Sequence, residues 1–161
     1  KAWLALDDGQ LSATIWINGR CIMTTQVRQV LGLRGGVTSR LELAGNIERG
    51  LPATTIHRVK EALALADMEV SSALGISTKT LSRLRKAGRR LPARIGDRFY
   101  RLAHIFALAS DVLESGDLAR EWLHTSQIGL NNRVPLELMM TEAGAREVED
   151  LLSRIEHGVL S

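Results

Sequence analysis

The segment DMEVSSALGISTKTLSRLRKAG, residues 67–88, decides the fold. Its pattern predicts a helix, a tight turn and a second helix. Gly75 tolerates the positive φ that a sharp turn needs, and Ser77 stands where a hydroxyl caps the next helix. Three apolar residues recur at spacings of three and four along one face of the first helix: Val70, Ala73 and Leu74.

The second predicted helix separates apolar from basic side chains. Leu81, Leu84 and Gly88 share one face, and at about 100° per residue the opposite face is polar and basic. In the major groove, Arg and Lys pair with guanine edges or phosphates, and Ser or Thr contacts either. We therefore expect DNA contacts from Thr78, Lys79, Ser82, Arg83, Lys86, Arg89 and Arg90. The alternative is an ordinary helical hairpin with a solvated basic face.

The charge of the chain is distributed unevenly. The net charge is +3, yet residues 79–101 hold nine basic residues and one acidic residue, a local net charge of +8. Residues 111–161 hold ten acidic and four basic residues, a net charge of −6. A cluster of positive charge beside a predicted recognition helix is typical of a nucleic-acid-binding protein.

The composition predicts a folded protein with an aliphatic core. Hydrophobic residues make up 45% of the 161 residues and aromatic residues only 4%, enough for one domain or two small ones that share a core. Cys21 is alone, so no internal disulfide forms, which fits a cytoplasmic protein in a reducing environment. No apolar run approaches the length of a membrane span.

The pattern of residues 1–24 predicts a short β-hairpin. Asn18 and Gly19 lie between two β-rich runs, residues 13–17 and 20–24, and Asn-Gly is a strong signal for a hairpin turn. The alternative is a poorly specified arm, one that pairs with another chain.

From Thr25 onward the pattern is helical, which makes the predicted fold all-α. A long helix is expected at about residues 95–113, with Asp117 as the cap of the next helix. Pro135 stands at a first helical position, where its fixed φ is favoured, and Thr141 caps the last helix. That helix carries an apolar stripe in which at least one leucine should be buried: Val148, Leu151, Leu152 and Ile155.

The residues that usually carry catalysis show no matching pattern. The four histidines are far apart in the sequence, and none has a second ligand at a metal-binding spacing. Cys21 has no histidine that the sequence singles out as its base. We therefore expect a binding protein without a cofactor or metal, and not an enzyme.

Two parts of the chain resemble a known family. The runs REWL (120–123), RVPLEL (133–138), TEAGAREVEDLL (141–152) and RIEHGV (154–159) resemble the toxin-binding domain of the Xre/MbcA/ParS antitoxins. The runs GLP (50–52), LGIS (74–77), TL (80–81) and DRFYRLA (97–103) resemble its Xre-type DNA-binding half. Family members usually carry Leu-Gly-Gly-Arg-Thr-Pro, where this chain has LNNRVP (130–135). Asparagine tolerates positive φ, so we expect that turn to persist.

The resemblance implies a bacterial antitoxin that binds a RES-domain toxin, blocks its consumption of NAD, and represses its own operon, normally as a homodimer. Taken with the residue patterns, it leads us to expect three parts: an N-terminal arm or hairpin (1–24), a helix-turn-helix domain (25–110) and a toxin-binding domain (111–161). The short apolar tail could enter the NAD pocket of the toxin, with contacts from Arg154, Glu156, His157, Gly158, Val159, Leu160 and Ser161. The alternatives are a stand-alone transcriptional regulator with an acidic dimerisation domain, and a small enzyme.

Overall fold

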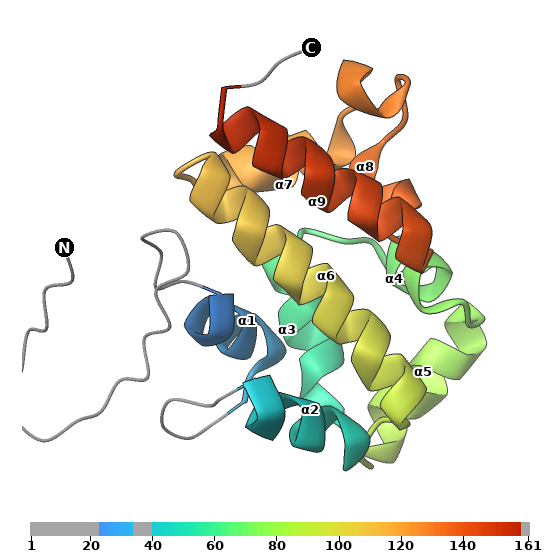
Figure 1. Cartoon of the computed structure of the whole chain (residues 1–161). Coiled ribbons are helices and arrows are strands. Elements are labelled where there is room, and N and C mark those ends of the chain that lie inside the picture. Colours follow the sequence, from blue (N-terminus) through green and yellow to red (C-terminus); the bar gives the residue numbers. More distant parts are fainter. Residues whose placement is uncertain (1–22, 34–39, 159–161) are drawn as a thin grey trace, which may run out of the picture.

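Helix α6 (Ala93–Val112) runs through the middle of the fold, and most of the other helices pack against it (Figure 1). The computed structural model describes residues 23–33 and 40–158. Within these ranges the chain forms helices and no strand, which confirms the all-α prediction. The other elements are α1 (Met23–Leu31), α2 (Arg40–Glu48), α3 (Thr54–Ala62), α4 (Asp67–Leu74), α5 (Thr78–Ala87), α7 (Gly116–His124), a 3₁₀ turn η1 (Ile128–Leu130), α8 (Pro135–Leu138) and α9 (Glu142–Glu156).

The core is aliphatic and continuous. Phe99, Leu102 and Ile105 of α6 are fully buried, and they belong to one cluster with buried residues from both ends of the described chain. Helix α6 packs against α1, α2 and α3 on the N-terminal side of the sequence and against α7 and α9 on the C-terminal side. The basic and acidic parts of the sequence therefore share one core. None of the described helices is long and apolar enough to cross a membrane.

The helix-turn-helix prediction is confirmed. Gly75 ends α4 with a left-handed backbone, φ 58°, as its lack of a side chain allows. The Ser77 side chain accepts a hydrogen bond from the backbone N–H of Thr80 at 3.1 Å and caps α5. Leu81 of α5 is fully buried, and Leu84 packs against the same core.

Most of the predicted N-terminal hairpin lies outside the described residues. For the two residues of it that are described, the prediction of a strand is wrong. Asn18 and Gly19 are not described, whereas Met23 and Thr24, expected in the second strand, begin α1. The physical reason is the burial of Val27 and Leu31 at helical spacing, which favours a helix that extends one turn upstream.

The predicted cap at Asp117 is also wrong. Helix α7 begins at Gly116, and the Ser115 side chain accepts a hydrogen bond from the Leu118 N–H at 3.3 Å. Asp117 lies in the first turn, where a carboxylate favours the helix dipole, and it pairs with Arg120. The other two predicted starts are confirmed: Pro135 begins α8, and the Thr141 side chain accepts a hydrogen bond from the Gly144 N–H.

Gly50 fastens the loop before α6 to the loop before α3. Gly50 has φ 86°, and a Cβ at this position would lie 2.5 Å from the carbonyl oxygen of Leu91. The Leu91 N–H donates to the Leu51 carbonyl at 2.7 Å, so the two loops are joined by backbone.

Gly50→Ala is expected to lower the free energy of unfolding by more than about 1–2 kcal/mol, the cost of a left-handed backbone for an L-residue. The clash with a backbone oxygen adds to that cost. Gly88→Ala is the control: Gly88 also has positive φ, but no described atom lies within 4 Å of the added carbon. Chemical denaturation should show the larger loss for Gly50→Ala, and equal losses would contradict the close approach.

Candidate functional site

Helix α5 presents a basic face to solvent. Lys79, Arg83 and Lys86 are exposed, and Ser82 is half-buried between them. These four side chains lie opposite the buried Leu81 and line one open hollow of about 540 Å³. Four of the predicted DNA contacts are therefore brought together on one face. Such a face can offer several hydrogen-bond donors to base edges and phosphates.

The other predicted DNA contacts lie at the two ends of α5. Thr78 is exposed in its first turn, and Arg89 and Arg90 are exposed in the loop that follows. Arg90 also has a partner inside the protein, because its Nη1 donates to the Gly50 carbonyl at 2.7 Å. Arg90 therefore holds the loop in place, a role that the sequence did not indicate.

Three further arginines of the basic segment have internal partners. Arg85 Nη2 lies 2.9 Å from the Asp67 carboxylate, Arg98 donates to the carbonyl of Leu74, and Arg101 joins an ion-pair network described below. The cluster of nine basic residues thus divides into three groups. Four arginines have partners inside the fold: Arg85, Arg90, Arg98 and Arg101. Three side chains face solvent from α5, namely Lys79, Arg83 and Lys86, and Arg89 and Arg94 are exposed beyond that helix.

Asp67 joins three helices at the start of α4. Lys60 Nζ from α3 lies 2.5 Å from one carboxylate oxygen, and Arg85 from α5 binds the other. Hydrogen bonds from Lys60, and then from Arg85, lower the pKa of Asp67 below its ordinary value of 3.8. The charged carboxylate is therefore favoured in the folded protein.

Asp67→Asn is expected to make the melting temperature less sensitive to acid. Because folding lowers the pKa of Asp67, its stabilisation is present above pH 3.8 and is lost as the pH falls through the lowered value. Melting temperatures measured between pH 3 and pH 6 should fall less steeply for Asp67→Asn than for the wild type. Glu147→Gln, at an exposed carboxyl on α9, is the control. Identical slopes for Asp67→Asn and the wild type would contradict the assignment.

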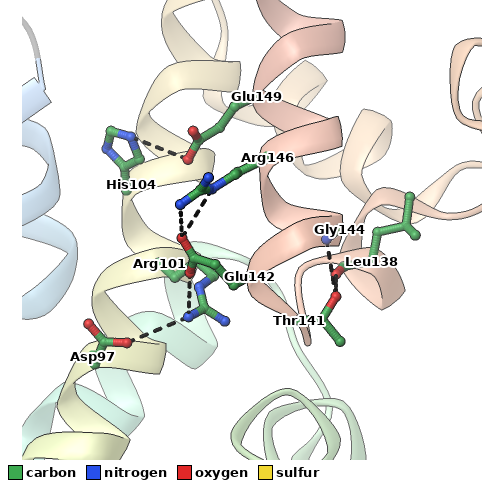
Figure 2. A network of polar contacts seen from close by, with 9 residues as sticks. All are labelled: Asp97, Arg101, His104, Leu138, Thr141, Glu142, Gly144, Arg146 and Glu149. Atoms are coloured by element: carbon green, nitrogen blue, oxygen red, sulfur yellow. Dashed lines mark hydrogen bonds and ion pairs between the residues drawn. The ribbon is translucent and has the colours of Figure 1, made fainter.

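A polar network joins α6 to α9 (Figure 2). Arg101 Nη2 lies 2.9 Å from the Glu142 carboxylate and 3.5 Å from that of Asp97. Arg146 reaches Glu142 at 3.4 Å, and His104 Nε2 lies 3.5 Å from Glu149. These residues line a cleft of about 220 Å³. Burial, and then the nearby charges of Glu142 and Asp150, raise the pKa of Glu149.

A second junction joins α7 to the end of α3. Arg120 Nε donates to the Ala62 carbonyl at 2.7 Å, and its guanidinium lies 5.8 Å from the centre of the Phe106 ring. His124 Nε2 lies 3.1 Å from the Leu63 carbonyl. Carbonyls at the end of α3 have no partner within their own helix, so these side chains satisfy them. The sequence does not indicate either junction, because the helices that each one joins lie far apart in the chain.

Helix α9 carries the predicted apolar stripe. Val148, Leu151 and Leu152 are buried, as expected, and Ile155 packs partly against the core. The stripe therefore belongs to the core.

At the end of α9 the structure places four of the predicted toxin contacts. Glu156 is its last residue, His157 is exposed, and Gly158 has φ 67°, which confirms the predicted stop. Arg154 is partly exposed, and its Nε is buried without a hydrogen-bond partner among the described residues. Val159, Leu160 and Ser161 lie outside the described residues.

The turn between α7 and α8 has asparagines at two left-handed positions. Asn131 and Asn132 both adopt left-handed backbones, φ 55° and 57°, as the sequence predicted. The Gln127 N–H donates to the Arg133 carbonyl at 3.0 Å and closes the turn. This turn therefore reproduces with asparagines a backbone shape that usually requires glycine.

Comparison with known proteins matches both parts of this structure. Residues 42–104 match the antitoxin Xre-like helix-turn-helix domain, and residues 108–158 match the antitoxin Xre/MbcA/ParS C-terminal toxin-binding domain. The first range contains α4 and α5, and the second contains α7, α8 and α9. The boundary between the two matches falls inside α6.

Three similar proteins are each named antitoxin Xre. An antitoxin Xre from Yersinia enterocolitica is 32% identical over 74% of this chain and 81% of its own length. Antitoxin Xre proteins from Photorhabdus laumondii and Pseudomonas putida are 27% and 26% identical, over 71% and 76% of this chain and 78% and 76% of their own lengths. A protein with an Xre-like helix-turn-helix and this C-terminal domain, similar over most of its length to these relatives, belongs to the Xre/MbcA/ParS family of antitoxins.

Proposed function

We propose that this chain is the antitoxin of a type II toxin-antitoxin system, which neutralises a toxin by direct binding and represses its own operon. The observation that carries the proposal is the joining, through α6, of a helix-turn-helix with an exposed basic face to a module similar to a toxin-binding domain. We assign DNA binding to residues 25–110 and toxin binding to residues 111–161. The protein would act in the cytoplasm, as a homodimer or larger assembly, and would not itself be an enzyme.

The proposed toxin is a RES-domain protein that consumes NAD. This choice rests on the family resemblance. The proposed contacts are Arg154, Glu156, His157, Gly158, Val159, Leu160 and Ser161, at the end of the acidic module. The apolar residues of this segment suit a pocket with apolar walls for the rings of NAD. Exposure of His157 and partial exposure of Arg154 support contacts at the rim of that pocket.

The test is co-expression with the product of the adjacent gene. We expect the two proteins to purify together and the purified toxin to consume NAD only in the absence of this chain. This chain alone should leave NAD unchanged. If the adjacent gene encodes no toxin and no partner is retained, the alternative holds: a stand-alone helix-turn-helix regulator in which α7–α9 serve dimerisation.

Deletion of Val159, Leu160 and Ser161 is expected to weaken neutralisation while folding and operator binding remain intact. Because α9 ends at Glu156, the deletion leaves its buried stripe in place. NAD loss should be followed at a fixed ratio of toxin to antitoxin. Full protection by the truncated protein would contradict the entry of this tail into the NAD pocket and would mean that the faces of the helices neutralise the toxin.

A further inference from the structure

Ile128, the first residue of η1, is 88% exposed. Among the large apolar side chains in the described ranges, this is the greatest exposed fraction. A single exposed apolar residue is ordinary on a protein surface, so exposure alone does not indicate a site. The surroundings of Ile128 are what distinguish it.

The two residues after Ile128 are fastened to α9. Leu130 is buried in the core. Gly129 lies so close to α9 that a Cβ at this position would be 2.5 Å from the Leu151 Cδ1. The backbone of η1 therefore rests directly on a buried leucine, and Ile128 projects outward from a fixed base.

The rest of the turn is closed by hydrogen bonds. The Asn132 N–H donates to the Gln127 carbonyl at 3.0 Å, beside the contact of the Gln127 N–H with the Arg133 carbonyl. The Gln127 side chain donates to the carbonyls of Trp122 and Thr125, at 3.1 and 3.0 Å. Asn131 and Asn132 then hold consecutive left-handed backbones, an arrangement that is uncommon for residues other than glycine and that occurs often at functional sites.

The turn lies far from the recognition helix. In Figure 1 the segment between α7 and α8 projects at the end of the molecule opposite α5. It also lies within residues 108–158, which match the toxin-binding domain. A protein bound at this turn would leave the basic face of α5 uncovered, so both partners could be bound at once.

We propose that Ile128 is an anchor residue for the toxin and inserts into an apolar pocket on its surface. This inference rests on the proposed function and extends the toxin contact from the end of α9 to η1. A rigid turn loses little conformational freedom on binding, so most of the burial of its side chain contributes to affinity. Anchors of this kind, seated in a partner's pocket, carry a large share of the binding energy of protein interfaces.

The experiment compares full-length wild type with Ile128→Asp for binding to the product of the adjacent gene. We expect Ile128→Asp to raise the dissociation constant by at least about tenfold, and Ile128→Ala by a smaller factor. Melting temperature and operator affinity should not change, because Ile128 contacts solvent and lies away from α5. Leu41→Asp is the matched control, since Leu41 is 83% exposed on α2, outside residues 108–158.

The outcomes distinguish a failure of the anchor proposal from a failure of the proposed function. If the wild type binds the toxin and Ile128→Asp binds equally well, this inference is overturned while the proposed function stands. If the wild type does not bind the toxin, the proposed function fails and the anchor with it. Should Ile128→Asp lower the melting temperature, Ile128→Ala, which adds no charge, decides the question by the same comparison.

Discussion

Replacing Leu152 with alanine is expected to lower the free energy of unfolding by about 2–5 kcal/mol. Leu152 is fully buried on α9, which packs against α6. Alanine removes most of this side chain and leaves a cavity that its neighbours can fill only by moving. Because the core is one continuous cluster, the loss should destabilise both the basic and the acidic parts of the chain together.

Urea denaturation measures this effect, with the slope of the transition as a check that the same surface is exposed on unfolding. Leu41→Ala is the matched control, because the same atoms are removed from a leucine that faces solvent. We expect its free energy of unfolding to stay within about 0.5 kcal/mol of the wild type. An unchanged midpoint for Leu152→Ala would mean that the apolar stripe of α9 is a surface and not a core.

The ends of several helices could be predicted from the sequence, because a single residue type meets the backbone or hydrogen-bonding requirement there. The sequence predicts that Gly75 ends α4, because glycine tolerates a left-handed backbone, and that Ser77 caps α5, because it has a hydroxyl; both predictions are confirmed. Thr141 and Pro135 were placed at helix starts for similar reasons. The buried face of α9 followed from apolar spacing alone. These features depend on neighbours within about one helical turn, so a single sequence contains all the information they need.

The exact start of a helix was less predictable. Ser115 and Asp117 are both good capping residues, and the chain uses Ser115, so α7 begins two residues earlier than a cap at Asp117 would place it. Met23 and Thr24 suit either a strand or a helix, and the burial of Val27 in the core favours the helix. In each case packing against distant residues selects between two locally acceptable starts.

The site itself was predictable only in part. The basic face of α5 follows from helical periodicity, so Lys79, Arg83 and Lys86 could be placed together. Charge alone could not show that Arg90 binds the Gly50 carbonyl or that Arg101 binds Glu142, because those partners lie about forty residues away. The same limit hid the exposure of Ile128, since only the fold shows which apolar residue of a loop is left outside the core.

The exposed basic face of α5 is expected to contact DNA. We expect the double variant Arg83→Ala, Lys86→Ala to weaken operator binding by at least about 1–3 kcal/mol, the contribution of one good base contact. Arg83 and Lys86 line the same hollow, and their removal leaves the buried Leu81 untouched, so folding should be preserved. The affinity should be measured by fluorescence anisotropy with an operator fragment and with an unrelated duplex of the same length.

Comparison of the two duplexes separates the roles of these side chains. A loss confined to the operator would mean that they contact base edges, whereas an equal loss on both would mean that they contact phosphates. In the second case the dependence of affinity on salt should also become shallower, by about one unit of slope for each phosphate contact removed. Arg133→Ala is the control, since it removes an exposed positive charge from the turn opposite α5. If the double variant binds both duplexes as tightly as the wild type, the basic face of α5 is only a solvated surface and another part of the chain must contact DNA.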